Sequence, residues 1–218
     1  MLKRFCDVIC SAFGILLFLP LMVVIAFIIK LTSRGPVLYA QARVGLHEKV
    51  FLVYKFRTMV DKADTLGTSV TTGVDPRVTP IGRFLRKTKL DELPQLFNVL
   101  KGDMSFVGPR PDVPEIVAKY TPEMRRIFSV RPGITSVATL HFRNGEAILS
   151  KVPEPDRFYD EAVVPLKVAL AMEHVRRNSF GFDLSILMQT VWALTPLVKI
   201  RPIEELEAVR QFREKYLL

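Results

Sequence analysis

The segment Lys89–Pro111, KLDELPQLFNVLKGDMSFVGPRP, carries the clearest structural signals in the chain. Its apolar side chains recur at i, i+3, i+4 and i+7, the spacing of one helix face, at Leu93, Leu96, Phe97 and Leu100. Pro94 is compatible only with the first turn of such a helix, where its missing N–H is not needed. Gly102 follows the last apolar position and is typical of a helix end. The pattern predicts a helix that begins near Asp91 and ends before Gly102.

Two adjacent carboxylates, Asp91 and Glu92, stand where this helix is expected to begin. We expect Asp91 at or beside the N-cap, where free N–H groups and the helix dipole favour an ionised carboxylate. One interpretation gives Asp91 no role beyond that of a cap. The upstream segment, residues 76–90, favours a second interpretation, because it has no acid and contains Arg77, Arg83, Arg86, Lys87 and Lys89. Carboxylates beside so many cations indicate chemistry on a phosphate.

Arg110 lies between Pro109 and Pro111 at the end of the same segment. Proline fixes its own φ, and it biases the residue before it toward an extended backbone. A guanidinium held in this way is partly pre-organised to bind a phosphate through two hydrogen bonds. We therefore expect Arg110 to act with the two carboxylates, provided that the fold brings them together.

Composition narrows the class of protein. The 218 residues carry a formal charge of +9, which favours polyanionic partners such as nucleic acid, anionic lipid or phosphorylated substrates. The mean hydropathy of +0.23 and the fifteen phenylalanines are unusual in a nucleic-acid-binding protein and indicate a membrane. The two cysteines, Cys6 and Cys10, and three scattered histidines suit neither a disulfide framework nor a zinc cluster. A glycine-rich phosphate-binding loop is also absent from the sequence.

Residues 8–29 form an uncharged apolar run of 22 residues, long enough to span a bilayer as a helix. A signal peptide is not favoured, because it would need a shorter apolar region and a cleavage site with small residues, and neither is visible. Pro20 divides the run into 12 and 9 residues, which reach roughly 18 and 14 Å, against a hydrocarbon core of ~30 Å. Lys3 and Arg4 precede the run, and Lys30 and Arg34 follow it. Positive charge at both ends favours a kinked, re-entrant helix with both ends cytoplasmic, and a simple spanning helix is the alternative.

The sequence pattern after residue 34 predicts a mostly helical α+β unit. Strand character at 37–39 and 51–56, joined through residues 45–49, predicts a β-hairpin, and 137–142 reads as another strand. Helices are expected over 166–177, 183–199 and 203–215. The broad apolar face of the 183–199 helix, which Asp183 is expected to cap, suits either a membrane interface or the core. The expected organisation is an anchor, residues 1–34, and a compact domain, residues 35–218.

Five motifs together resemble the bacterial sugar transferases, the small monotopic phosphoglycosyl transferases. They are RVG at 43–45, YKFRTM at 54–59, GRFLRK at 82–87, the segment 90–111 and RPGIT at 131–135. The resemblance covers roughly residues 1–136. It implies transfer of a phospho-sugar from a UDP-sugar to a polyprenyl (undecaprenyl) phosphate with release of UMP. It also implies Mg²⁺, a re-entrant membrane helix, and a catalytic domain with interfacial helices on the cytoplasmic face of the bacterial inner membrane.

The resemblance assigns roles to individual residues. Asp91 matches the nucleophile, which would form a covalent aspartyl phospho-sugar, and Glu92 matches the second carboxylate, a base or a metal-site partner. Mg²⁺ would then lie at Asp91 and Glu92. The cations expected to bind phosphate or substrate are Lys55, Arg86, Arg110 and Arg131. Membrane lipids and a homodimer are expected partners, and nucleic acid is not.

Two departures from the family pattern limit what the resemblance implies. Leu19 stands where many relatives have a serine before the membrane proline, so the kink relies on Pro20 and packing. Residues 136–145 also differ, which leaves the donor sugar open. Two alternatives from other classes are a membrane-tethered nucleic-acid-binding protein and a non-catalytic scaffold. Neither requires the Asp91–Glu92 pair.

Overall fold

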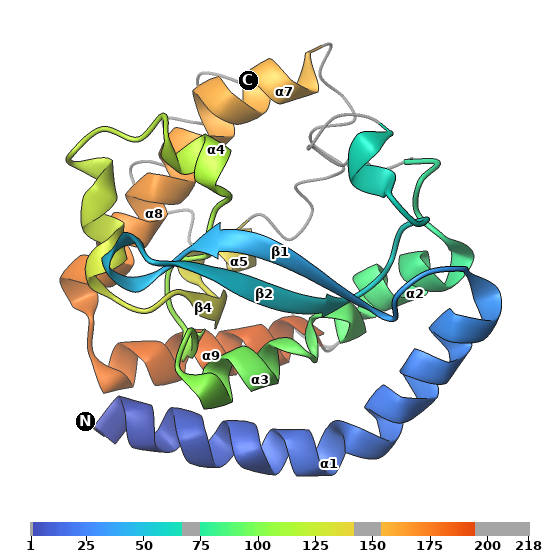
Figure 1. The fold of residues 1–218 in the computed structure, drawn as a ribbon. Coiled ribbons are helices and arrows are strands. Elements are labelled where there is room, and N and C mark those ends of the chain that lie inside the picture. Colours follow the sequence, from blue (N-terminus) through green and yellow to red (C-terminus); the bar gives the residue numbers. More distant parts are fainter. Residues whose placement is uncertain (1, 67–74, 142–153, 195–218) are drawn as a thin grey trace.

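The computed structural model describes residues 2–66, 75–141 and 154–194 (Figure 1). Its helices are α1 Leu2–Thr32, α2 Pro80–Thr88, α3 Gln95–Lys101, α4 Pro114–Val117, α5 Val137–His141, α7 Pro155–Phe158, α8 Val164–Arg177 and α9 Phe180–Leu194. The strands are β1 Leu38–Val44, β2 Val50–Phe56, β3 Ser105–Val107 and β4 Gly133–Thr135. The described part is therefore mostly helical with little sheet, as expected.

The two small sheets join segments that are distant in the sequence. β1 and β2 form the expected antiparallel hairpin, in register from Leu38 opposite Phe56 to Val44 opposite Val50. The first strand is longer than the predicted 37–39, because β2 pairs along its whole length. β3 and β4 form a short parallel pair, so that residues 105–107 lie beside residues 133–135. This pairing brings the proline-flanked arginine segment next to the RPGIT motif.

The prediction of a strand at 137–142 is wrong, since Val137–His141 is the helix α5. Ser136 begins this helix: its Oγ accepts the N–H of Thr139 at 2.9 Å, and its carbonyl accepts the N–H of Leu140 at 3.2 Å. A short apolar run does not distinguish a strand from a buried helical turn by periodicity. The serine cap decides between them.

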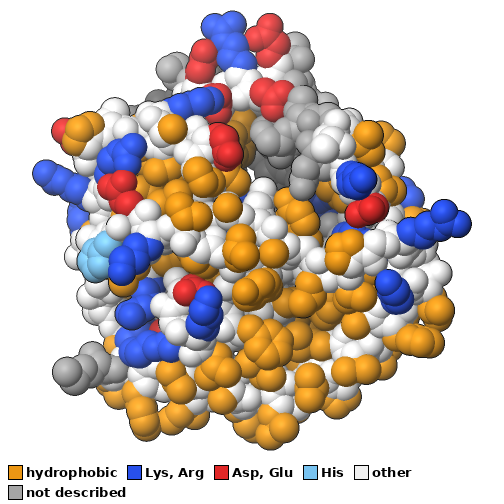
Figure 2. All heavy atoms as spheres, in the orientation of Figure 1, with side chains coloured by type: hydrophobic (Ala, Val, Ile, Leu, Met, Phe, Trp, Pro, Cys, Tyr) orange, Lys and Arg blue, Asp and Glu red, His pale blue; other side chains and the backbone are white. Residues whose placement is uncertain are grey.

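Helix α1 is long and apolar enough to cross a membrane, with a mean hydropathy of 3.0 in its most apolar window. It continues through Pro20 as one helix, with no break into two helices at the proline, and Figure 1 shows that the helix bends. Only 17% of that window is buried against the rest of the protein. Figure 2 shows apolar side chains covering the lower part of the molecule, where α1 lies in Figure 1.

Both ends of α1 are attached to the rest of the described protein. At the N-terminal end, the guanidinium of Arg4 donates to the carbonyls of Val99 and Leu100, the latter at 2.9 Å. Nearby, buried Asp7 accepts the hydroxyl of Ser105 at 3.1 Å. At the other end, Met22, Ile25 and Ile29 share a core cluster with Phe56 and Leu85. The anchor is therefore bound at two places to one folded unit.

The C-terminal helices α8 and α9 lie close to the expected positions, but the expected cap at Asp183 is not present. Helix α9 begins at Phe180, so Asp183 lies inside it and does not cap it. Asp183 is buried and lies 2.6 Å from Lys3 Nζ in α1. One side of α9 packs into the core through Ile186, while Leu184, Met188, Val191 and Trp192 are exposed. Residues 195–199 and the helix expected at 203–215 lie outside the described residues.

Candidate active site

The carboxylates lie on a tight connection between two helices. Thr79 caps α2 by accepting the N–H of Gly82 at 3.0 Å, in agreement with the cap-then-proline sequence. Helix α2 ends at Thr88, and the next residue, Lys89, has a left-handed φ of 59° that turns the chain. A single 3₁₀ turn, η3 Leu90–Glu92, follows, and only then does α3 begin. Asp91 and Glu92 therefore sit on their own turn.

This arrangement corrects the prediction that Asp91 caps the following helix. Pro94 is the residue before α3, and no side chain caps that helix. The buried face of the helix is also different from the predicted one, because Phe97 and Leu100 are 41% and 38% exposed. Leu96 is buried as predicted, whereas Asn98 and Val99 are buried in place of Phe97 and Leu100. The helix end at Gly102 is confirmed. The turn η3 places the start of α3 at Gln95, later than the predicted start near Asp91.

Glu92 holds two cations from different parts of the fold. Its Oε1 accepts hydrogen bonds from Lys55 Nζ at 2.8 Å and from Arg110 Nη2 at 2.9 Å. Lys55 comes from β2, and Arg110 comes from the loop after β3. Burial opposes ionisation, but the charges of Arg110 and Lys55 outweigh it and hold the pKa of Glu92 far below its usual range. Glu92 is thus an ionised carboxylate that fixes both cations.

Asp91 has a contrasting environment. Its side chain is 7% exposed, and its Oδ1 is buried with no hydrogen-bond partner among the residues that the structure describes. Burial raises the pKa of Asp91, Lys55 opposes this shift, and the charge of Glu92 adds to it. Burial, and not the expected helix N-terminus, therefore dominates the environment of this carboxylate. Two neighbouring acids with opposite pKa shifts are typical of groups with separate chemical roles.

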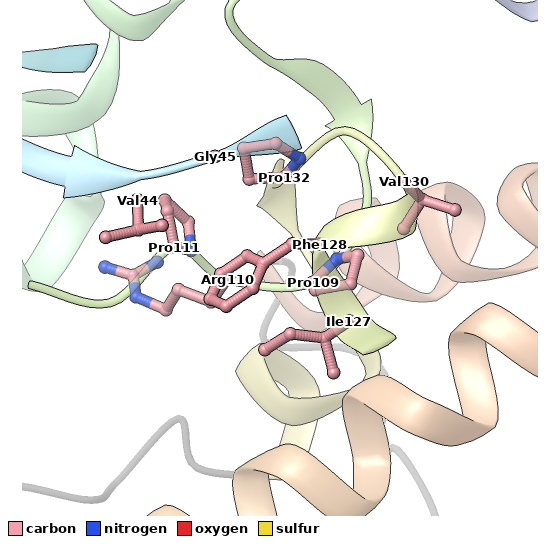
Figure 3. A pocket seen from close by; sticks show the side chains of 9 residues that line it. All are labelled: Val44, Gly45, Pro109, Arg110, Pro111, Ile127, Phe128, Val130 and Pro132. Carbon is pink, nitrogen blue, oxygen red and sulfur yellow. The ribbon is translucent and has the colours of Figure 1, made fainter. Parts of the chain in front are cut away.

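Close backbone packing holds the arginine loop. A Cβ on Gly108 would lie 2.3 Å from the carbonyl oxygen of Arg131, so only glycine fits between β3 and β4. Arg43 Nη1 donates to the carbonyl of Pro111 at 3.0 Å and fastens the far end of the loop. Figure 3 shows the mostly apolar side chains that line a pocket around the arginine loop. The guanidinium of Arg110 points away from Val130.

The structure places the other expected cations differently. Arg86, on α2, is close enough to Asp91 to lower its pKa slightly, so it belongs to the same region. Arg131 donates from Nε to the carbonyl of Gly102 at 3.0 Å and supports the end of α3. Of the four expected cations, Lys55 and Arg110 contact Glu92 directly.

Sequence reasoning missed several residues that support the loop. Tyr120 donates its hydroxyl to Asp112 Oδ2 at 2.7 Å, and Val44 N–H donates to the carbonyl of Asp112 at 3.0 Å. Asp112 thus accepts the hydroxyl of a buried tyrosine, and Val113 is the residue before α4. The RVG motif at 43–45 was the available signal for Arg43. No sequence signal indicates the hydrogen bond from Tyr120 to Asp112, because it depends on tertiary contact.

The side-chain atoms present at the site determine whether a metal ion fits there. Among the described residues, no group of three or more His, Cys, Asp or Glu side chains is placed to hold a metal. Mg²⁺ does not require one, since it is usually bound by one or two carboxylates together with substrate phosphates and water. The unpartnered Oδ1 of Asp91 is an oxygen of the required kind. The residues therefore fit a substrate-borne Mg²⁺ better than a cage made by the protein alone.

Comparison with known proteins places these features in a family. The family model described as bacterial sugar transferase matches residues 1–196. A UDP-N-acetylgalactosamine-undecaprenyl-phosphate N-acetylgalactosaminephosphotransferase of Aeromonas hydrophila is 44% identical over 196 residues, 87% of this chain and 43% of that protein. An undecaprenyl-phosphate glucose phosphotransferase of Komagataeibacter xylinus is 38% identical over 200 residues, 87% of this chain and 35% of that protein.

A further relative is similar in length. The uncharacterized sugar transferase EpsL of Bacillus subtilis is 42% identical over 190 residues, which are 87% of this chain and 85% of that protein. By contrast, the chain spans less than half the length of the Aeromonas hydrophila and Komagataeibacter xylinus proteins. The family model's match, residues 1–196, includes every residue of the candidate site.

Proposed function

Because this chain belongs to the bacterial sugar transferase family, we propose that it transfers a phospho-sugar from a UDP-sugar to undecaprenyl phosphate and releases UMP. The observation that carries the proposal is the arrangement at η3, where Glu92 holds Lys55 and Arg110 beside the unpartnered carboxylate oxygen of Asp91. The relatives whose names state a substrate act on undecaprenyl phosphate and carry a sugar phosphate. These names support the acceptor and the reaction type and leave the sugar open.

In the first step, the carboxylate of Asp91 attacks the β-phosphorus of the donor. A bond forms between the carboxylate oxygen and phosphorus, and the bond from phosphorus to the bridging oxygen breaks, so that UMP leaves with the electron pair. Lys55 and Arg110 supply positive charge for the phosphate oxygens. Glu92 keeps both cations in place and stays ionised throughout. The product is an aspartyl phospho-sugar.

In the second step, a phosphate oxygen of the lipid attacks the same phosphorus. The bond between phosphorus and Asp91 breaks, and the carboxylate is regenerated. The product is the sugar joined to the lipid through a diphosphate. Division into two steps suits substrates of very different solubility, because UMP departs before the lipid arrives. A bound Mg²⁺ would neutralise phosphate charge and hold the donor at Asp91 and Glu92.

The membrane arrangement belongs to the same proposal. We infer that α1 enters and leaves the bilayer by its cytoplasmic face and bends at Pro20. The attachment of both ends of α1 to one folded unit supports this topology, since a spanning helix would place one end across the membrane. The exposed residues of α9 would lie at the interface of the bacterial inner membrane, with residues 35–218 as the catalytic domain.

A reconstituted assay tests the function. The purified chain is incubated with Mg²⁺, undecaprenyl phosphate and UDP-glucose, UDP-galactose or UDP-N-acetylgalactosamine, and UMP is measured. We expect UMP release with at least one donor, loss of release in Asp91→Asn, and retention in the matched control Asp103→Asn, whose carboxylate pairs with Lys101. Failure of every donor would contradict the proposal and favour a membrane-tethered binding protein.

A further inference from the structure

Asn98, in α3, has a side chain that crosses to the neighbouring strand. The residue is fully buried, with 0% of its surface exposed, although asparagine is mostly found at protein surfaces. Its Nδ2 donates to the carbonyl of Leu52 at 2.7 Å, and its Oδ1 accepts the N–H of Tyr54 at 3.0 Å. Both partners are backbone groups of β2. The side chain therefore ties α3 to the strand that carries Lys55.

The position of these bonds explains their effect. β2 pairs with β1 along one edge, and within the described residues its other edge has no strand partner. A carbonyl at one residue and an N–H two residues later are the groups that a neighbouring strand would bond. A carboxamide offers one acceptor and two donors, so it reproduces the pairing of a peptide group. Asn98 thus takes the place of an adjacent strand at one point.

This tie sets where Lys55 lies. Lys55 directly follows Tyr54, and its Nζ is 2.8 Å from Glu92 Oε1. Because strand side chains alternate between faces, a slip of one residue would turn Lys55 away from Glu92. The bonds of Asn98 to residues 52 and 54 fix both the position of β2 along α3 and the face that Lys55 uses. Val53 and Val99, packed in one buried cluster, allow sliding that the two directional bonds do not.

We infer that Asn98 is a positioning residue that holds β2 in the register placing Lys55 Nζ against Glu92. Its contacts are with the protein backbone, so it acts through Lys55 and does not touch the reacting groups. The placement of Lys55 follows from the contacts alone. Its consequence for turnover rests on the proposed transfer reaction.

The first test measures the placement without using activity. The full chain in nanodiscs is treated with a limiting amine-acetylating reagent, and acetylation of Lys55 is followed by peptide mass spectrometry. Asn98→Ala should raise the acetylation rate of Lys55 several-fold, because the amine is released from Glu92. The matched control, Thr190→Val, removes a 2.7 Å hydrogen bond to Thr135 elsewhere and should leave the rate unchanged. An unchanged Lys55 rate in a cooperatively unfolding Asn98→Ala protein would overturn the inference.

The second test uses Asn98→Asp and pH. A protonated carboxyl has one donor and one acceptor, as the tie requires, whereas an ionised one would repel the carbonyl of Leu52. UMP release relative to the unaltered chain should fall roughly 10- to 100-fold at neutral pH and recover as the pH is lowered. Thr190→Val should show a ratio that does not vary with pH. A pH-independent ratio for Asn98→Asp would count against the inference.

A double-mutant cycle separates positioning from general destabilisation. Asn98→Ala should cost far less UMP release in a Lys55→Ala background than in the unaltered chain, whereas Thr190→Val should cost the same in both. Additive effects of Asn98→Ala and Lys55→Ala would overturn the inference. If the unaltered chain releases no UMP, the proposed function fails, and the acetylation rates still decide the role of Asn98.

Discussion

At the scale of single residues, the site depends on one carboxylate shared by two cations. Glu92 is 12% exposed in its side chain, and its Oε1 accepts from both Lys55 and Arg110. Burial alone lowers the pKa of Lys55, and the charge of Glu92 opposes that shift. The pKa of Lys55 is lowered overall, and Glu92 limits this shift while it holds the amine in position. Asp91, beside it, is left with an oxygen free of hydrogen bonds and suited to attack.

The first prediction concerns the charge of Glu92. Glu92→Gln leaves the half-buried Lys55 and Arg110 beside each other without a counter-charge. Loss of one partner of a buried ion pair costs up to about 3–5 kcal/mol. We expect a lower melting temperature, measured by thermal denaturation, and strongly reduced UMP release. The exposed Glu115→Gln serves as a control and should change neither quantity. A stable, active Glu92→Gln protein would mean that the two cations need no shared carboxylate.

The second prediction concerns pH. Burial raises the pKa of Asp91 above its usual value of about 3.9, and only the ionised carboxylate attacks phosphorus. UMP release should therefore increase as the pH rises through that raised pKa. Because Lys55 lowers the pKa of Asp91, Lys55→Met should move the midpoint of this rise to higher pH. A midpoint that stays or moves down, in kcat/KM measured against pH, would contradict the assigned environment.

At the scale of elements, α1 is part of the support of the active site. Lys3 donates to the carbonyl of Val107, just before the arginine loop, and Arg4 donates to the last carbonyls of α3. A cation at a helix C-terminus stabilises both the unpaired carbonyls and the helix dipole. The first turn of the anchor thus holds the two elements that follow the carboxylates and precede Arg110.

The third prediction tests that support. Arg4→Ala removes charged hydrogen bonds to the end of α3, each worth about 1.5–3 kcal/mol. The protein should melt at a lower temperature in detergent and lose UMP release in parallel. Lys49→Ala, at an exposed site in the hairpin connection, is the matched loss of charge and should have little effect. Equal behaviour of the two variants would show that the anchor is independent of the site.

The elements also show how far the sequence could predict the site. The helix end at Gly102, the cap at Thr79 and the β-hairpin follow from local patterns, and all three are present. The turn η3 could not be predicted, because it depends on the left-handed backbone of Lys89, a residue with no preference for that conformation. The same turn explains why Asp91 does not cap α3.

At the scale of the whole molecule, α1 is attached at both ends to the folded unit and carries many of its exposed apolar side chains. The exposed side chains of α1 dominate the apolar surface (Figure 2). The contacts that assemble the site are long-range: Lys55 with Glu92 spans 37 positions, and Arg4 with Val99 spans 95. No local pattern encodes such pairs. The sequence predicted the participants through the family motifs, and the fold was needed to pair them.

The fourth prediction concerns topology. In a chain carrying Cys6→Ser and Cys10→Ser, single cysteines are introduced as Leu2→Cys or Thr32→Cys, at the two ends of α1. If α1 is re-entrant, a membrane-impermeant maleimide added to intact cells should label neither, and both should react after the membrane is opened. Labelling of either cysteine from outside intact cells would show that α1 spans the membrane.

The covalent intermediate at Asp91 is the central claim. The purified chain is mixed with Mg²⁺ and a UDP-sugar donor that supports UMP release, without lipid acceptor, and analysed by intact-protein and peptide mass spectrometry. The account predicts an added mass equal to one phospho-sugar, located on the peptide containing Asp91, absent from Asp91→Asn and discharged by undecaprenyl phosphate. An unmodified protein during UMP release, or an adduct that persists in Asp91→Asn, would contradict it.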